Sequence, residues 1–518
     1  MQDPIWLGTV FITSERENAG HPEKIVINEY GNDYAKEARM LAQVIPIVRS
    51  NTAFEAEADW KEPFLHYMGE RMADMDSKGP IESLSDISAL LWAGRAEILG
   101  QLALTFISRR FGELLTQEFC SCPLCGKTLK YRGVHKREVI TLSARFDLRR
   151  PYFYCVTCSH GFYPLDEALG LSGSAKQHDV QELATWLATE LPFEAAEDAM
   201  KRSTGIEMSS PAIHGTVKAV SAKLDVLDDC PSKQEILVKI TELSEGKRIR
   251  PVLMLTLDGA MAPVRPEPSP YKGERGSGDW EEVKGFRLYL IDKDRIIHLM
   301  SWHQIGTADD LASALLAIKQ AELIPEDRVR LCVVADGAAW IWNRIEQLFP
   351  TAKQVLDYYH CSEHLHELAA AQYGKGTLKA QEWVDASLLR LFLKQKSHVI
   401  AGIKRMKPAS AEAANLIKQT AAYLKKHSKR LDYGTLRRGG YHIGSGAIES
   451  ANKLICHVRL KRPGAWWYPS NANNMLKLRC AKYNGTYGKV MQLHRLKDQR
   501  RTIHPPTHQE SGAPSDPV

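Results

Sequence analysis

The sequence predicts a multidomain α+β protein, and three observations lead to this fold class. The chain has 518 residues, which corresponds to roughly three to four domains of average size. Helical patterns fill both ends of the sequence, whereas short apolar runs alternate with helices between Pro251 and Tyr358. Two Cys-x-x-Cys pairs stand between the first helical region and this alternating segment.

The composition is that of a globular protein with an uneven distribution of charge. Hydrophobic residues make up 44% and charged residues 25%, which excludes fibrous or disordered structure for most of the chain. Between Arg437 and Arg501 there are 14 Lys or Arg residues against only Glu449 and Asp498, a charge of +12, while the whole chain carries +6. A basic segment on an otherwise acidic chain indicates a polyanionic partner, usually nucleic acid.

Residues 1–16 have no basic stretch followed by a small-residue cleavage site, so we expect no signal peptide. No apolar run approaches the roughly 18–20 uncharged residues of a membrane span. We therefore expect a cytoplasmic protein without a membrane partner.

The N-terminal region, residues 1–117, is predicted to be helical, most clearly over 87–115, where Leu91, Ile98, Leu102 and Phe106 recur at helical spacing. Residues 118–165 are instead rich in Cys, Gly and aromatic residues, and are predicted to form small hairpins. Cys122 and Cys125 form one thiolate pair there, and Cys155 and Cys158 form a second one after 29 intervening residues. Four such ligands predict a zinc ribbon with a structural Zn²⁺, and Cys120 and His160 are alternative ligands.

Residues 166–235 are predicted to contain helices over 180–190, 193–204 and 210–224. Gly205 separates the last two, and Ser209-Ser210-Pro211 is typical of a helix start with a capping hydroxyl. The pattern fits a helix-turn-helix-like DNA-binding segment and a trihelical spacer equally well.

The alternating segment predicts strands over 252–257, 286–291, 296–302, 329–335 and 353–356, with a helix over 308–321. These elements indicate a mixed α/β sheet. Residues 361–435 are almost all helix formers, and a Gly-rich turn then leads to a helix that contains Glu449. The segment 486–518 is predicted to be basic and then, after His504, disordered.

Two apolar strands are predicted to end in the same way, at Leu255-Thr-Leu-Asp258-Gly and at Val333-Val-Ala-Asp336-Gly. Each Asp alone is more typical of a turn before Gly, but acids at the carboxyl edge of neighbouring strands meet in a ligand crevice. Glu449 alone would balance nearby Lys and Arg charges. Together the three carboxylates are what two-metal phosphoryl transfer with Mg²⁺ or Mn²⁺ requires.

Asp258, Asp336 and Glu449, in the contexts LDGA, ADGA and GSGAIES, resemble the DDE triad of insertion-sequence transposases with an RNase H-like catalytic domain. With the CPLCG and CVTC ribbon before them and RLKRPGAWW after Glu449, residues 85–485 are most similar to the ISKra group. The motif Asp357-Tyr-Tyr-His360 resembles the D-x-x-H motif of several such families.

The resemblance implies an RNase H-like domain in two parts, 250–360 and 441–485, interrupted by an all-α insertion at 361–440. It implies a DNA transposase, both nuclease and strand transferase, that uses two Mg²⁺ or Mn²⁺ ions. Its partners would be double-stranded DNA, as terminal inverted repeats and target, and further copies of the chain in a synaptic complex. We expect DNA contacts from part of the basic segment: Lys453, Arg459, Lys461, Arg462, Trp466, Lys477 and Arg479. Each Trp there is by itself more typical of a core.

Two other functions fit parts of the sequence. A transposase-derived DNA-binding protein without catalysis would use the ribbon and the helical segment alone. A zinc metalloprotease is suggested by His360-Cys-Ser-Glu363-His364, which fits the H-x-x-E-H pattern but leaves the ribbon, the three acids and the basic segment unexplained.

Overall fold

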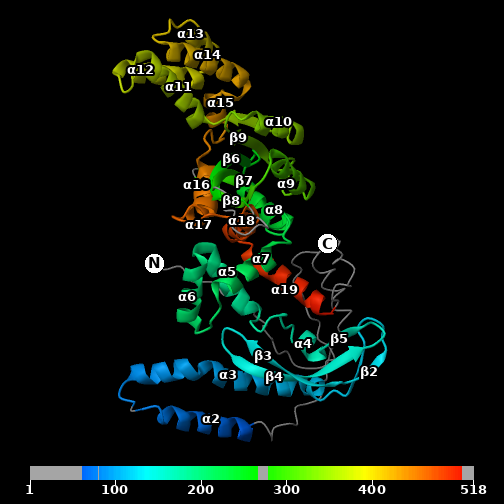
Figure 1. Cartoon of the computed structure of the whole chain (residues 1–518). Coiled ribbons are helices and arrows are strands. Elements are labelled where there is room, and N and C mark those ends of the chain that lie inside the picture. Colours follow the sequence, from blue (N-terminus) through cyan, green and yellow to red (C-terminus); the bar gives the residue numbers. More distant parts are fainter. Residues whose placement is uncertain (1–60, 80, 267–277, 294, 504–518) are drawn as a thin grey trace, which may run out of the picture. The chain divides into compact units, whose positions relative to one another are not determined.

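The computed structural model describes residues 61–79, 81–266, 278–293 and 295–503, all within one compact unit, Glu57–Val518 (Figure 1). The predictions for residues 1–60 and for the tail after His504 lie outside the described residues. The described part combines many helices with β-sheets, which confirms a mixed α+β architecture.

The predicted helix at 87–115 is present as α3 (Leu84–Leu115), which follows α2 (Lys61–Asp76). It begins where Ser83 and Asp86 cap each other's backbone N–H groups. By length and composition alone, α3 is the one described helix that could cross a membrane. In the structure it packs on β4 (Arg145–Cys155), and Gly100 permits the close approach, since a Cβ there would collide with the carbonyl oxygen of Arg145.

The cysteine-rich region forms the predicted small hairpins. Strands β1 (Phe119–Ser121) and β2 (Thr128–Lys130) pair with each other, and β3 (Gly133–Ile140), β4 and β5 (His160–Phe162) form a three-stranded antiparallel sheet. The short helix α4 (Pro164–Ala168) follows. Its buried Asp166 forms two ion pairs, with Oδ2 lying 2.8 Å from Nη1 of Arg137 and Oδ1 lying 2.5 Å from Nε of Arg150. Strands β3 and β4 thus share one small core with α3 and α4.

The three predicted helices of the next segment are present as α5 (His178–Glu190), α6 (Phe193–Thr204) and α7 (Ser210–Ser221), and α8 (Lys233–Ser244) follows. Ser209 occupies the cap position of α7, but its hydroxyl makes no capping bond. The start of α7 is capped by Glu197 of α6 instead. Oε2 of Glu197 accepts hydrogen bonds from the backbone N–H and the hydroxyl of Ser210, at 2.7 and 2.6 Å. The turn is therefore fixed by a contact between two helices.

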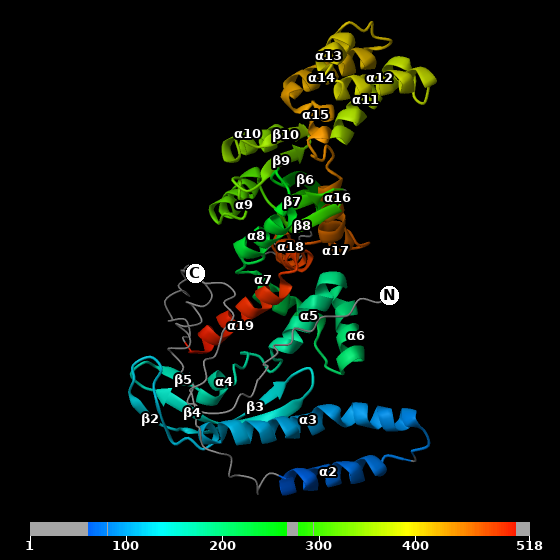
Figure 2. The same ribbon diagram turned by 180° about the vertical axis from the view of Figure 1, so that it is seen from behind.

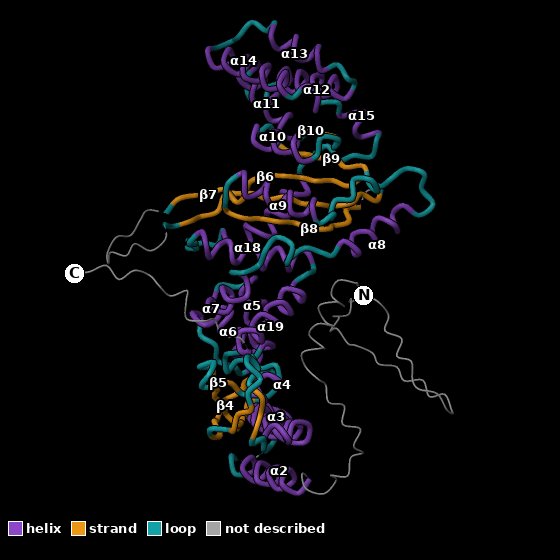
Figure 3. Tube along the Cα trace, turned by 90° about the vertical axis from the view of Figure 1, so that its right-hand side faces the viewer, coloured by secondary structure: helices purple, strands orange, loops and turns teal. Residues whose placement is uncertain are grey.

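A five-stranded mixed sheet occupies the centre of the chain. Its order is β10-β9-β6-β7-β8, from β6 (Val252–Val264), β7 (Asp279–Asp292), β8 (Arg295–Ile305), β9 (Arg330–Ala335) and β10 (Lys353–Leu356). Strand β9 is parallel to β6 and β10, whereas β6, β7 and β8 are antiparallel to their neighbours within this group. Figure 3 shows β6, β7 and β8 running side by side. The predicted strands are all present, and β6 and β7 are longer than expected.

Both faces of the sheet are covered by helices, so its strands are apolar on both sides. Leu253, Leu255 and Leu257 pack with α8, α9 (Ala308–Gln320) and α10 (Ala339–Leu348). The alternate residues of β6 pack on the opposite face, where α16 (Gly446–Asn452) lies (Figures 1 and 2). This alternation follows from the period of two in a strand.

The helical excursion begins at the end of β10. It contains α11 (Tyr358–Tyr373), α12 (Leu378–Phe392), α13 (Lys396–Lys404), α14 (Ala411–Lys426), the short 3₁₀ turn η1 (Ser428–Arg430) and α15 (Tyr433–Arg438). These helices pack with the β10 side of the sheet. The excursion returns through residues 439–445 to α16.

After α16 the chain continues through a π-helical turn, η2 (Lys453–His457), and then α17 (Val458–Leu460), α18 (Pro469–Asn484) and α19 (Tyr487–Ile503). The segment predicted as a basic tail is thus helical as far as Ile503. Its first turn is packed, because Tyr487 is buried and its hydroxyl lies 2.5 Å from Oγ1 of Thr185 in α5. Helices α5–α7 and α16–α19 share one apolar core.

Candidate functional site

Asp258 and Asp336 come to the same level of the sheet. Strand β6 does not end at Asp258, as the sequence predicted, because β7 pairs with it as far as Val264 and places Gly285 opposite Asp258. Strand β9 does end just before Asp336. The parallel pairing of β6 with β9 runs to Thr256 and Val334, so each Asp lies two residues beyond the last pair.

Glu449 reaches this edge from α16, which packs on β6 and β7. The helix is held down by Arg287 of β7, which donates from Nη1 to the carbonyl oxygen of Ala447 at 2.7 Å. Ser445, just before the helix, donates its hydroxyl to Oε1 of Glu449 at 2.8 Å. At the end of the helix Asn452 donates from Nδ2 to Oδ2 of Asp258 at 2.8 Å. Two polar side chains therefore orient two of the acids.

The three acids interact electrostatically. Burial is the main cause that raises the pKa of Asp258 to about 6. The backbone N–H of Gly259 and the charge of His360 oppose this rise, while the negative charges of Asp336 and Glu449 add to it. Protonation or a bound cation relieves this repulsion. Among the described residues, only the four cysteines of the ribbon gather three or more ligand atoms within 4.8 Å, so the acids are less closely spaced than that.

Asp357 and His360 form a pair beside the acids. Asp357 follows β10, is fully buried, and caps α11. Its Oδ2 lies 2.5 Å from Nδ1 of His360 and 3.0 Å from the Ser445 hydroxyl, whose one proton is shared with Glu449, and its Oδ1 accepts from the backbone N–H of Ser445 at 2.9 Å. Burial raises the pKa of Asp357, but the hydrogen bonds of His360 and Ser445 outweigh this and leave it below its ordinary value. The same bond raises the pKa of His360 to about 9, so this pair is ionic at neutral pH.

The ribbon brings all four predicted cysteines together. Sγ of Cys122 lies 4.0 Å from Sγ of Cys158, and Sγ of Cys125 lies 3.7 Å from Sγ of Cys155. Tetrahedral Zn²⁺ with bonds of about 2.3 Å requires sulfurs about 3.8 Å apart, so the donor set fits this ion. Cys120, the spare thiol, is outside the group, and burial raises its pKa to about 11. His160 is buried on β5 opposite Cys155 and is also outside the group.

The basic residues predicted to contact DNA divide into exposed and enclosed ones. Lys453 is exposed, Lys461 and Arg462 are half-buried, and Trp466 keeps 44% of its surface exposed. Trp467 is buried, and its backbone N–H donates to the carbonyl oxygen of Pro263 at 3.2 Å. One Trp of the pair is thus available to a partner, and the other belongs to the core.

Arg459 and Arg479 are enclosed, contrary to the expectation that they face DNA. Arg459 donates from Nε to the carbonyl oxygen of Ala188 at 2.8 Å, and its guanidinium lies over the ring of Trp467. Arg479 donates from Nε to the carbonyl oxygen of Ile455 at 2.7 Å. Both side chains are buried. Each supplies a hydrogen-bond donor to a carbonyl group near the end of a helix, where the backbone itself offers no donor. Neither can reach a phosphate without local unfolding.

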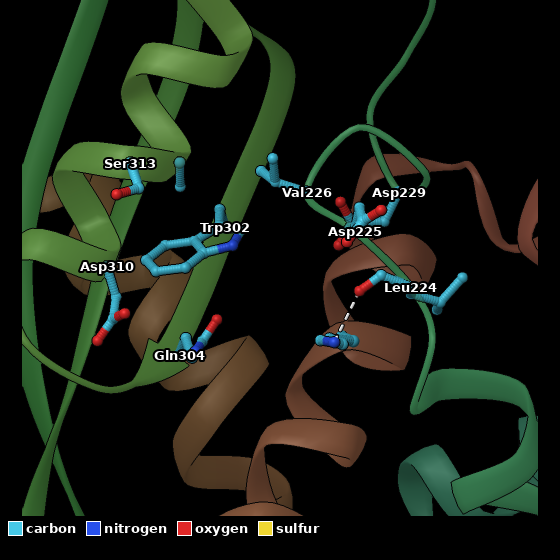
Figure 4. Close-up of a pocket in the computed structure, with 10 residues that line it drawn as sticks. Leu224, Asp225, Val226, Asp229, Trp302, Gln304, Asp310 and Ser313 are labelled. Atoms are coloured by element: carbon cyan, nitrogen blue, oxygen red, sulfur yellow. Dashed lines mark hydrogen bonds between the residues drawn. The ribbon is translucent and has the colours of Figure 1, made fainter. Parts of the chain in front are cut away.

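Lys477 is also turned inward. Its Nζ donates to the carbonyl oxygen of Leu224 at 2.7 Å, the dashed bond in Figure 4, and it borders a cavity of about 280 Å³ that Asp225, Asp229 and Trp302 also line. Burial raises the pKa of Asp229 to about 8, although Lys477 opposes this. Lys477 therefore has acidic partners inside the fold.

Some residues of the site carry no sequence signal. Ser445 and Asn452 lie close to Glu449 in the sequence, but their second partners, Asp357 and Asp258, are 88 and 194 residues away. His303, whose Nε2 lies 2.9 Å from Oδ1 of Asn452, is likewise distant. Only the Gly-Ser-Gly turn could have drawn attention to Ser445.

The H-x-x-E-H motif does not form a metal site in the described part of the chain, where no cluster includes His360 or His364. Nδ1 of His360 is engaged by Asp357, and the ring of His364 lies 4.3 Å from that of Tyr423. The structure thus offers nothing in favour of the metalloprotease.

Comparisons with known proteins give remote matches. No family model matches the sequence. The UPF0236 protein in vanSb 3'region of Streptococcus gallolyticus is 24% identical over 337 residues, which are 63% of this chain and 68% of that protein. The structure of the Drosophila P element transposase strand transfer complex matches 61% of this chain and 80% of its own, at 11% identity and a TM-score of 0.22. The Mos1 strand transfer complex matches 50% and 80%, at 11% identity and a TM-score of 0.13. At such TM-scores neither structure bears on the function of this chain.

Proposed function

We propose that this chain is a DNA transposase that binds the ends of an insertion sequence and carries out metal-dependent strand cleavage and strand transfer. Asp258, Asp336 and Glu449 are its catalytic carboxylates. The observation that carries the proposal is geometric: Asp258 and Asp336 each lie two residues beyond the last β6–β9 pair, at one level of a mixed sheet, and Glu449 of α16 lies close enough to act on Asp258. The mixed sheet and the helical excursion before α16 support an RNase H-like domain of the DDE type, as in the ISKra group.

The donor chemistry suits hard divalent cations. Carboxylate oxygens are the ligands preferred by Mg²⁺ and Mn²⁺. The pKa of Asp258 is raised mainly by burial and further by the charges of Asp336 and Glu449, and a cation would favour the ionised carboxylate against both effects. Asp258, Asp336 and Glu449 would hold two such ions, whose chemistry there would be to lower the pKa of a water molecule and to stabilise negative charge on the departing 3′ oxygen.

The residues around the acids keep them in place. Ser445 links Glu449 to the buried Asp357, and Asn452 links α16 to Asp258. Fixing carboxylates before cations arrive reduces the reorganisation that catalysis would otherwise require. The protonated His360 adds a positive charge beside Asp336.

DNA contacts are assigned to Lys453 and Trp466, which are exposed, and to Lys461, which is half-buried. Arg459, Arg462, Lys477 and Arg479 are left out because they donate to backbone carbonyl groups inside the fold. Helices α5–α7 are a second candidate DNA-binding element, and the ribbon with its four cysteines is a structural Zn²⁺ site. Pairing of two element ends requires further copies of the chain, and the protein acts on DNA in the cytoplasm.

A cleavage assay on DNA that flanks the gene tests this function. The wild type should cut at the inverted repeats with Mg²⁺ or Mn²⁺, while Asp258→Asn, Asp336→Asn and Glu449→Gln should each bind the DNA and not cut it. Glu363→Gln serves as a matched control, because Glu363 is the base of the metalloprotease hypothesis and has no part in the carboxylate triad. Cutting by Asp258→Asn would refute the assignment. DNA binding without cutting by the wild type would identify the non-enzymatic alternative.

A further inference from the structure

A second cavity, of about 590 Å³, borders the proposed catalytic centre. Its walls come from Ile291, Lys293 and Ile296 of the β7–β8 hairpin, the start of α11, the end of α12, and residues 437–447. None of the functions assigned above to the acids or to the basic segment uses it. Its volume lies within the roughly 300–1,000 Å³ typical of small-ligand sites.

The cavity is lined by aromatic rings that pack edge-on against one another or against other rings of the fold. The Tyr358 ring lies 5.6 Å from that of Phe392 and 5.4 Å from that of Tyr433, both edge-on. Tyr359 leans edge-on against Tyr358 at 5.5 Å, yet 59% of Tyr359 is exposed. Tyr441 also lines the cavity. An exposed ring held on a fixed neighbour offers a planar surface for stacking at little entropic cost.

Two of the described residues that line the cavity carry a charge at neutral pH, Lys293 and Arg437. Both are cations, and both are exposed. Arg330 lies over the Tyr441 ring from outside the lining, 5.2 Å from its centre. Aromatic faces with cations at the rim match a ligand that has a flat heterocycle and a phosphate.

The cavity is continuous with the catalytic turn. Gly444 and Gly446 line it, and Ser445 between them binds Asp357 and Glu449. A Cβ on Gly444 would collide with the Tyr359 ring and would lie 3.6 Å from Oδ1 of Asp357. The backbone that supports Glu449 therefore forms a wall of this cavity.

We infer that this cavity binds an unpaired deoxynucleotide of the strand next to the cleavage point, with its base on Tyr359 and its phosphate between Lys293 and Arg437. The inference rests on the proposed function and names a feature of its substrate. Paired bases in a duplex expose no ring faces, so the aromatic lining selects a strand that is open at this point. The site would hold the DNA end open while the neighbouring carboxylates act on it.

The test compares two DNAs with the same duplex sequence, one blunt and one with a short unpaired thymidine extension. Full-length protein is titrated with each by fluorescence anisotropy, without added divalent metal, so that no cleavage occurs. The wild type should prefer the extended DNA, and Tyr359→Leu should reduce this preference by about tenfold, as expected for one lost stack. Tyr359→Phe should retain it, and so should Tyr131→Leu, which removes an exposed Tyr near the ribbon. Arg437→Gln should make the affinity for the extended DNA less dependent on salt concentration, and should not change the salt dependence for the blunt DNA.

Equal affinity of the wild type for both DNAs, or an unchanged preference in Tyr359→Leu, would overturn the site. A protein that cleaves DNA but shows no such preference refutes the cavity and leaves the proposed function intact. A protein that prefers the extended DNA but never cuts refutes the proposed function and leaves the cavity intact.

Discussion

Asn452 joins the helix of Glu449 to the strand of Asp258, because its Nδ2 donates to Oδ2 of Asp258 at 2.8 Å. Its other amide atom, Oδ1, lies 2.9 Å from Nε2 of the buried His303. Burial lowers the pKa of His303 to about 4, so this ring is neutral and can donate to the amide oxygen. The amide thus has a partner on each side and fixes the rotamer of Asp258.

Replacing Asn452 with Ala should impair catalysis more than folding. We expect a loss of DNA cleavage of about 10- to 100-fold, as is usual when the partner of a metal-binding carboxylate is removed. The concentration of Mg²⁺ needed for half-maximal cleavage should rise, and affinity for the terminal DNA should not change. A purely structural role for Asn452 would lower the melting temperature and leave the Mg²⁺ requirement unchanged.

The secondary structure could be predicted well from the sequence because the apolar periods are clear. The strands at 353–356 and the helix at 193–204 agree with the structure at both ends. Strand β6 was predicted too short, because Asp258-Gly259 and Pro263 in its second half are typical of turns, whereas pairing with β7 keeps this half extended as far as Val264. The helix α19 was missed, because its basic composition suggested a tail.

The candidate site could be predicted only in part. Asp258 and Asp336 were expected to meet because each was predicted to end an apolar strand of one α/β sheet, and the pairing of β6 with β9 brings them to one level. The positions of Ser445 and Asn452 depend on contacts with distant residues, which a single sequence does not reveal. Charge counting also treated all bases alike, although backbone carbonyl groups enclose Arg459 and Arg479.

The ribbon should hold one Zn²⁺ per chain. Cys122→Ser should lose the metal, because a tetrahedral site that is closed by four sulfurs does not tolerate the loss of one thiolate. Zinc measured in the purified protein by atomic emission should fall from one equivalent to near zero. Cys120→Ser and His360→Ala should retain it, and loss of zinc from the His360 variant would support the metalloprotease instead.

Arg459 and Lys453 should affect different properties of the protein. Arg459→Ala removes a buried guanidinium between α17 and α5, so unfolding should become easier by about 2–3 kcal/mol. Lys453→Ala should leave stability unchanged and reduce the salt slope of DNA binding by about 1. Urea unfolding and binding at several salt concentrations measure the two effects. A change in the salt slope with Arg459→Ala, at unchanged stability, would contradict the enclosed position.

Asp229 should make the protein less stable as the pH rises. Its Oδ1 is buried and has no hydrogen-bond partner among the described residues, and burial raises its pKa from 3.8 to about 8. Between these two values the unfolded chain has released the proton and the folded chain still holds it. The folded state therefore binds more protons, and by linkage the free energy of unfolding falls as the pH increases through this window.

The variant Asp229→Asn cannot ionise, so its free energy of unfolding should not fall in this way. Its melting temperature should exceed that of the wild type at pH 8 and match it at pH 4. Asp225→Asn, on the same loop at an exposed position, is the control and should follow the wild type. An equal pH dependence for wild type and Asp229→Asn would show that Asp229 ionises as freely in the folded protein as in the unfolded chain.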